Sequence, residues 1–154
     1  MSETDAFSTI IVPLDGSEQS MRAAKSAVMV AAKYGASVTA VYVVNIDQYL
    51  QSFGLYRLSY PDVVKKKIEE AEAEAKGWFA EIQNIADRAG VSFSHHVIDT
   101  PHSVVAAIIE YAENEKASLI VIGTRGRSGF KKLLLGSVAS GVVTYATCPV
   151  LVVR

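Results

Sequence analysis

The amino-acid sequence predicts an α/β protein, with an open parallel sheet that carries helices on both faces. Short apolar runs rich in β-branched residues alternate along the chain with longer segments whose apolar side chains recur every three or four residues. Strands that alternate with helices in this way are joined by right-handed crossovers and lie parallel in one sheet. Half of the 154 residues are hydrophobic and 20% are charged, which excludes a disordered chain.

Five apolar runs are predicted to be strands. They are rich in Val and Ile, and the second is apolar on both faces, as expected of a strand buried inside a parallel sheet. The predicted strands are residues 7–14, 36–44, 91–98, 118–123 and 149–153.

Two long helices are predicted in the first half of the chain. Residues 17–34 end at Gly35, and residues 61–89 end before Gly90, because glycine commonly stops a helix. Their apolar stripes are Met21, Ala24, Val28 and Ala31 in the first, and Ile68, Ala71, Ala75, Trp78, Ile82, Ile85 and Ala89 in the second.

Two shorter helices are predicted in the second half. Thr100 is a good N-cap, with Pro101 at the first helical position of a helix that buries residues of the 105–112 stretch. Its buried positions are expected to be Val105, Ile108, Ile109 and Ala112, and residues 137–146 can form a last helix.

Residues 45–60 show no clear period and are predicted to be a long loop. Four aromatic side chains fall in this segment, at Tyr49, Phe53, Tyr56 and Tyr60. They are expected either to fold over a site as a lid or to cover a partner surface.

Length and composition predict one cytoplasmic domain that spans residues 1–154. About 100–200 residues is the usual size of a domain. The acidic N-terminus and the absence of an apolar run of about 20 residues predict neither a signal peptide nor a membrane span. The only cysteine, Cys148, allows no internal disulfide and is expected to be a small buried hydrophobic residue.

A glycine-rich basic stretch follows the fourth predicted strand. Gly123, Gly126 and Gly136-Ser137 are separated by two and nine residues. Glycine backbone can approach a ligand closely, and the free N–H groups of a helix that opens at Ser137 favour an anion. Ligands of open parallel sheets bind beyond the carboxyl ends of the strands, so the stretch is a candidate phosphate cradle.

Two familiar phosphate-binding motifs are excluded by spacing. No glycine is followed by Lys-Ser or Lys-Thr, as a Walker A loop requires. The glycines of residues 123–129 run G-x-x-G-x-x-G after the fourth strand, whereas the dinucleotide fingerprint is G-x-G-x-x-G after the first.

The glycine spacing, with a first strand that ends in Pro13-Leu14-Asp15 and a last strand Pro-Val-Leu-Val-Val, resembles the universal stress protein family, in its ATP-binding branch. The resemblance covers essentially the whole chain. It implies a Rossmann-like sheet of the adenine nucleotide alpha hydrolase type, in strand order 3-2-1-4-5, and a homodimer formed through residues 149–153.

The resemblance also implies a nucleotide site. ATP, AMP or another adenine nucleotide would be the ligand, with Mg²⁺ or Mn²⁺ held mainly by the phosphates. The glycines with Ser137 and Val138 match triphosphate and ribose positions, and the first and second strand ends match adenine and ribose positions. The candidate binding residues are Pro13, Leu14, Asp15, Val43, Ile122, Gly123, Arg125, Gly126, Gly136, Ser137 and Val138.

Three functions remain open from the sequence. The first is a nucleotide-dependent regulatory or stress-response protein that acts on an unidentified protein partner. The second is a slow ATPase or phosphotransferase, for which Asp15 is the only carboxylate expected near the site. The third is a module that binds a partner through the basic and aromatic segments without nucleotide.

Two further features concern the ligand: the histidine positions argue against a shared metal ion, and the charge distribution favours a small anion. His95 and His96 are adjacent on a strand, point to opposite faces and so cannot hold one metal ion together. The net charge of −1 is the sum of −7 over residues 1–115 and +6 over residues 116–154. The basic groups therefore gather at the glycine stretch, which suits a polyphosphate better than a long nucleic acid.

Overall fold

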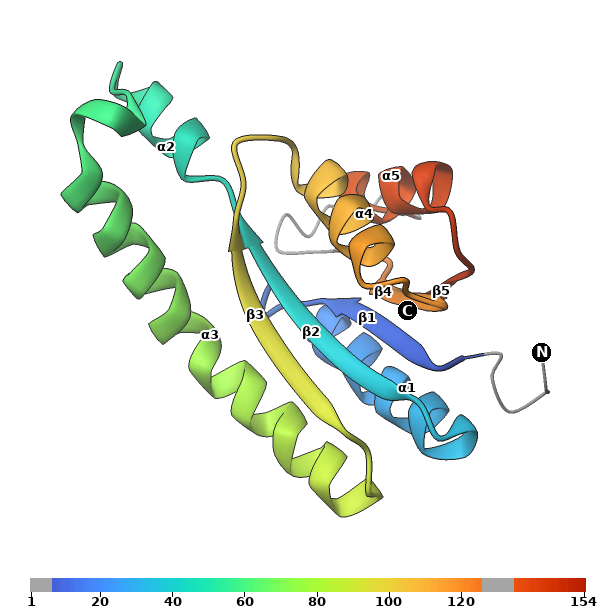
Figure 1. Ribbon diagram of the computed structural model, residues 1–154. Coiled ribbons are helices and arrows are strands. Elements are labelled where there is room, and N and C mark those ends of the chain that lie inside the picture. The colour runs from blue at the N-terminus through green and yellow to red at the C-terminus, as the bar shows by residue number, and fades with distance from the viewer. Residues whose placement is uncertain (1–6, 126–134) are drawn as a thin grey trace.

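The structure, a computed structural model, describes residues 7–125 and 135–154 and contains the predicted five-stranded parallel sheet. The strand order is β3-β2-β1-β4-β5 (Figure 1), as the family resemblance implies. The strands are β1 (Thr9–Pro13), β2 (Ser37–Val44), β3 (Phe93–Asp99), β4 (Leu119–Gly123) and β5 (Val150–Val153).

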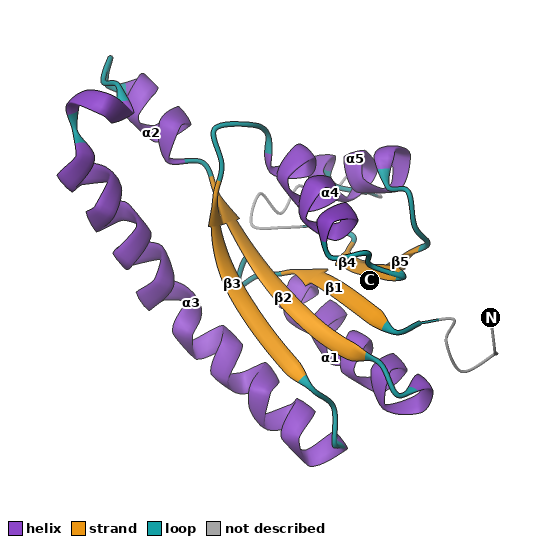
Figure 2. Cartoon of the chain, viewed as in Figure 1, coloured by secondary structure: helices purple, strands orange, loops and turns teal. Residues whose placement is uncertain are grey.

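Helices cover both faces of the sheet (Figure 2). Helices α1 (Glu18–Tyr34) and α3 (Pro61–Ala89) pack on one face, and α4 (Val104–Asn114) and α5 (Ser137–Tyr145) pack on the other. The described part of the chain has no helix that is both long and apolar enough to cross a membrane.

The alternation of side chains along β1 divides the core into two clusters. Ile10 and Val12 point toward α1 and α3, whereas Ile11 points toward α4 and α5. All three are fully buried, and each contributes about 1.5–3 kcal/mol through the burial of its side chain.

The ends of α1 and α3 follow local sequence signals. The Ser17 hydroxyl accepts a hydrogen bond from the Ser20 N–H and caps the start of α1. Gly35 and Gly90 adopt left-handed conformations that end α1 and α3, with φ of 67° and 69°. The predicted bounds of both helices are therefore confirmed.

The predicted start of α4 is wrong by three residues. Ser103 is the N-cap, because its Oγ accepts the Ala106 N–H at 3.1 Å. The hydroxyl of Thr100 instead accepts the His102 N–H at 3.0 Å, which makes a local turn that leaves Pro101 outside the helix.

The buried stripe of α3 also differs from the predicted one. Val64, Phe79 and Ala86 are buried, whereas Ile68, Trp78 and Ile85 are half-buried. Ala89, the last residue of α3, is exposed. Ala71, Ala75 and Ile82 are buried as predicted.

The predicted long loop at residues 45–60 is wrong, because most of it is helical. Helix α2 spans Ile46–Ser52, and a 3₁₀ helix, η2, spans Arg57–Ser59. Ile46 and Leu50 of α2 pack against Val64 of α3 in a third, small cluster. We call residues 45–60 the α2–η2 segment below.

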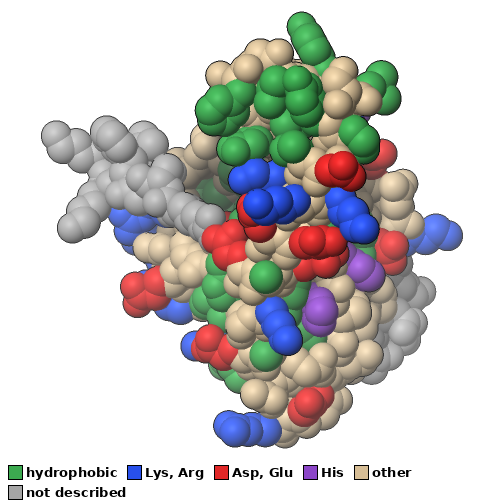
Figure 3. All heavy atoms as spheres, turned by 90° about the vertical axis from the view of Figure 1, so that its left-hand side faces the viewer, with side chains coloured by type: hydrophobic (Ala, Val, Ile, Leu, Met, Phe, Trp, Pro, Cys, Tyr) green, Lys and Arg blue, Asp and Glu red, His purple; other side chains and the backbone are tan. Residues whose placement is uncertain are grey.

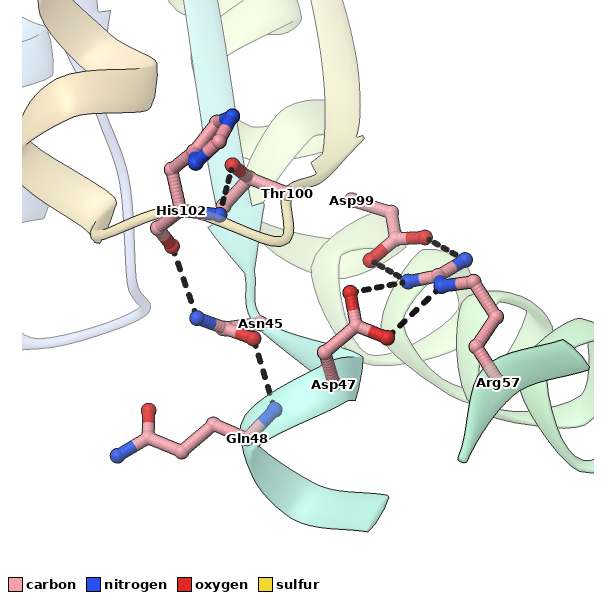
Figure 4. A network of polar contacts seen from close by, with 7 residues as sticks. All are labelled: Asn45, Asp47, Gln48, Arg57, Asp99, Thr100 and His102. Carbon is pink, nitrogen blue, oxygen red and sulfur yellow. Dashed lines mark hydrogen bonds and ion pairs between the residues drawn. The ribbon is translucent and has the colours of Figure 1, made fainter. Parts of the chain in front are cut away.

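Ion pairs and hydrogen bonds fasten the α2–η2 segment to the sheet (Figure 4). The guanidinium of Arg57 bonds to Asp99 at the end of β3, with an Nη1–Oδ2 distance of 2.7 Å, and to Asp47 of α2, with an Nε–Oδ1 distance of 2.9 Å. The hydrogen bonds to Asp99 and Asp47 raise the pKa of Arg57 above its usual value. Asn45 accepts the Gln48 N–H and donates to the His102 carbonyl, so the segment is also tied to the turn before α4.

We expect alanine to have opposite effects at two helical glycines. At Gly77, in α3, a Cβ would meet nothing within 4 Å, so Gly77→Ala should raise the free energy of unfolding by about 0.5–1 kcal/mol through helix propensity. At Gly141, in α5, a Cβ would lie 2.7 Å from Val105 Cγ2 of α4, so Gly141→Ala should lower the free energy of unfolding by about 1–2 kcal/mol. Urea denaturation of both variants measures the difference, and a stabilising Gly141→Ala would contradict the close packing of α4 on α5.

Candidate functional site

A cleft opens at the carboxyl ends of β1, β2 and β4, where the strand order reverses between β1 and β4. Its cavity volume is about 170 Å³. This is the edge at which open parallel sheets bind ligands.

The structure brings the described members of the predicted site together around this cleft. Gly126 lies outside the described residues. The predicted residues that line the cleft are Pro13, Leu14, Asp15, Val43, Ile122, Gly123, Arg125, Gly136, Ser137 and Val138. These residues lie together in the structure, and their role in binding a nucleotide stays a prediction.

Five lining residues were not predicted. Val41 could have been found from its spacing of two to Val43, because alternate residues of a strand share a face. Ile108 was predicted as a core residue, and Val104 lies one turn before it. The complete set of additional residues is Ser20, Val41, Val104, Ile108 and Ala139.

The walls of the cleft are apolar. Val41 and Val43 of β2 and Ile122 of β4 form the sheet side, and Val104 and Ile108 of α4 form the helix side. A slot of this kind suits a flat, largely apolar ring, since ligand pockets combine apolar walls with a few polar groups that fix orientation.

The start of α5 provides the polar side. Gly136 is its N-cap and offers no side chain to the first N–H groups of the helix, those of Ser137 and Val138. The N-terminus of a helix carries a partial positive charge and binds anions through these N–H groups. Arg125 lines the same cleft, and its guanidinium adds a full positive charge.

The two ends of the glycine-rich stretch are joined within the described residues. The Gly136 N–H donates to the Thr124 carbonyl oxygen at 2.6 Å, and the Thr124 N–H donates to the Val153 carbonyl oxygen at 2.9 Å. The start of α5 is therefore fixed against the ends of β4 and β5.

Gly123 has a structural reason to be glycine that is independent of any ligand. A Cβ at this position would lie 2.9 Å from the carbonyl carbon and oxygen of Gln19 in α1. The absence of a side chain thus allows α1 to begin close to the end of β4.

Asp15 belongs to a tight turn between β1 and α1. Its Oδ1 accepts the Ser17 N–H at 2.9 Å, its own N–H donates to Ser20 Oγ at 3.3 Å, and Gly16 between them has a φ of 82°. Asp15 is the only carboxylate among the described residues that line the cleft, and no histidine is among them.

The α2–η2 segment does not act as a lid in this structure. None of its residues is among the described residues that line the cleft. Its aromatic side chains instead face solvent at one end of the molecule (Figure 3), with Phe53 64% exposed and Tyr56 73% exposed. Leu58, which the sequence analysis did not single out, is 96% exposed.

The two adjacent histidines lie on opposite faces of the sheet, as predicted, whereas Cys148 is less buried than predicted. His95 stacks on Phe79 of α3 with ring centroids 4.3 Å apart, whereas His96 lies 6.0 Å from Tyr111 of α4 on the other face. Among the described residues no group of three or more His, Cys, Asp or Glu could hold a metal ion. Cys148 is half-buried at the edge of the core, and burial raises the pKa of its thiol.

Comparison with known proteins identifies close relatives in sequence and structure. The model of the universal stress protein family matches residues 6–154. Universal stress protein MJ0531 of Methanocaldococcus jannaschii is 36% identical over 149 residues, which cover 96% of this chain and 82% of that protein.

Solved structures give the same result. Universal stress protein UspA from Lactobacillus plantarum superimposes with a TM-score of 0.81 at 27% identity, over 96% of this chain and 98% of the other. A universal stress protein solved in complex with cAMP has a TM-score of 0.67 at 25% identity, over 96% and 97% of the two chains. The sequence match over residues 6–154, together with the shared sheet, shows that this chain belongs to the universal stress protein family.

Proposed function

We propose that this protein binds ATP in the cleft at the β1–β4 switch point and acts as a nucleotide-dependent regulatory protein. The observation that carries the proposal is that one cleft holds both an apolar slot and the start of α5, whose N-cap Gly136 provides no side-chain cap. A purine and a polyphosphate are chemically different ends of one ligand, and the cleft offers each a matching environment. The structural neighbour in complex with cAMP supports an adenine nucleotide as the ligand class.

The lining residues suggest how the nucleotide lies. The adenine would occupy the slot beside Val41, Val43 and Ile122, and the phosphates would meet the N–H groups of Ser137 and Val138. Gly126, which lies outside the described residues, is a further phosphate-binding residue predicted from the family resemblance. Asp15 would meet the ribose or the adenine from the β1 end.

A divalent ion, Mg²⁺ or Mn²⁺, would accompany the phosphates. The described lining offers it one carboxylate, that of Asp15, and this carboxylate already accepts the Ser17 N–H. Mg²⁺ commonly keeps several waters and binds largely through substrate phosphates, so the site fits an ion that the nucleotide brings with it.

A regulatory role is favoured over efficient catalysis. Phosphoryl transfer requires a residue that orients or deprotonates the attacking nucleophile. The described lining supplies only Asp15 for this purpose, and its carboxylate is held in the β1–α1 turn. The exposed aromatic residues of the α2–η2 segment are available to a protein partner.

We also propose a homodimer formed through β5, an edge strand of the sheet. The Ile120 N–H donates to Pro149 and the Thr124 N–H donates to Val153, so alternate residues of β5 face β4. Val150 and Val152 therefore turn their backbone N–H and C=O groups outward. A second copy could pair with this edge, and half-exposed Leu151 would be covered in the pair.

The binding proposal predicts a charge-sensitive position at the start of α5. Ser137→Glu should weaken ATP binding at least tenfold, about 1.4 kcal/mol, because its carboxylate would lie where the phosphates bind. A glutamate in the first turn favours the helix itself, so stability should be kept. Titration calorimetry with ATP and Mg²⁺ is the measurement.

Ser140→Glu is the matched control. Ser140 is also exposed and lies one turn further along α5, outside the described lining of the cleft. We expect its ATP affinity to stay within threefold of the wild type. Wild-type protein that binds no ATP below millimolar concentration would end the proposal.

Hydrolysis should be slow. With Asp15 as the only carboxylate of the described lining, we expect release of inorganic phosphate from ATP well below 1 s⁻¹, the lower end of ordinary enzyme turnover. A phosphate-release assay on purified protein measures it. A rate of about 1 s⁻¹ or faster would favour an ATPase instead.

The dimer proposal predicts that the outward edge of β5 is sensitive to proline. Val152→Pro removes an outward N–H and leaves the β4–β5 hydrogen bonds in place, so it should shift the protein toward monomer with the fold retained. Val152→Ala keeps the N–H and should remain dimeric. Light scattering after size-exclusion chromatography measures both, and a monomeric wild type would refute the dimer.

A further inference from the structure

We propose that Trp78 of α3 is a positioning residue for the nucleotide site, which holds the Asp15-Gly16-Ser17 turn in the shape that binding requires. The inference rests on the proposed function. Trp78 is the only tryptophan of the chain and is half-buried.

The indole ring lies directly against Gly16. A Cβ built on Gly16 would overlap the ring atoms Cζ2 and Cε2 of Trp78. Gly16 also has a φ of 82°, which side-chain-bearing residues rarely adopt. Glycine has the most flexible backbone of all residue types, and the rigid indole ring of Trp78 limits the conformations that Gly16 can adopt in this turn.

The ring is itself supported by two elements. The rings of Trp78 and Tyr42 of β2 meet edge to face, with centroids 5.1 Å apart and an interplanar angle of 80°. The Tyr42 hydroxyl donates to Glu74 Oε2 at 3.1 Å, and Glu74 lies one turn before Trp78 on α3. The position of the indole is thus set by the sheet and by the helix together.

Trp78 contacts the turn from the side of the core and not from the cleft. It packs against the core cluster of α1 and α3, whereas most of the helical residues that line the cleft belong to α4 and α5 on the other face of the sheet. Asp15 lines the cleft and Trp78 is not among the described lining residues. An effect of Trp78 on nucleotide binding would therefore pass through the backbone of the turn.

The physical consequence of losing the ring is loss of preorganisation. Without the indole, Gly16 gains access to other backbone conformations, and the Asp15 carboxylate, which accepts the Ser17 N–H, loses its fixed position in the turn beside the cleft. A smaller fraction of the protein molecules would then hold the turn in its binding conformation. The apparent affinity for the nucleotide would fall in proportion to that fraction.

The test compares Trp78→Ala with Phe79→Ala. Phe79 is the next residue of α3, is buried, and contacts His95 away from the turn. We expect Trp78→Ala to raise the dissociation constant for Mg²⁺–ATP about tenfold, and Trp78→Phe, which keeps a ring beside Tyr42, to raise it about threefold. Phe79→Ala should lower the urea midpoint at least as far as Trp78→Ala and leave the dissociation constant unchanged.

A nucleotide-free measurement separates this inference from the proposed function. In the ¹H–¹⁵N spectrum of the protein without ATP, the amide signals of Gly16 and Ser17 should move in Trp78→Ala and stay in Phe79→Ala. If wild-type protein binds no ATP, the proposed function fails, while unmoved amide signals in Trp78→Ala would refute the contact itself. Equal ATP affinity of wild type and Trp78→Ala, or an equal loss in Phe79→Ala, would overturn the positioning role.

Discussion

The two-sided burial of β1 is the constraint on which the rest of this structure depends. Ile10, Ile11 and Val12 are fully buried, and their side chains alternate between two cores that are built by different helices. A strand held from both faces has a fixed carboxyl end. That end carries Asp15 into the cleft and marks the point where the chain order of the sheet reverses, so the site is a consequence of how the core is assembled.

The apolar walls and the polar side of the cleft come from different parts of the fold. Its apolar walls come from regular strands and from α4. Its polar side comes from chain ends and turns, namely the start of α5 and the turn after β1. Family members can therefore share the fold while they differ in ligand, because the polar groups are the part that the core does not determine.

The sequence predicted the elements whose signals are local and missed those that depend on distant contacts. Strands with β-branched runs, and helices that end at Gly35 and Gly90, were found because pattern and cap agree. The α2–η2 segment was missed because its helices are stabilised by Leu50 packing on α3 and by Arg57 pairing with Asp99, 42 residues away. In the site, glycine spacing predicted the polar groups, whereas Val104 entered the cleft only through the packing of α4 on the sheet.

The hydrogen bond from Gly136 to Thr124 fastens the start of α5 to the end of β4. A substitution elsewhere in the sheet that displaces the end of β4 would therefore also displace the first N–H groups of α5. The anion-binding end of this helix is thus held in place by the sheet rather than by the helix alone.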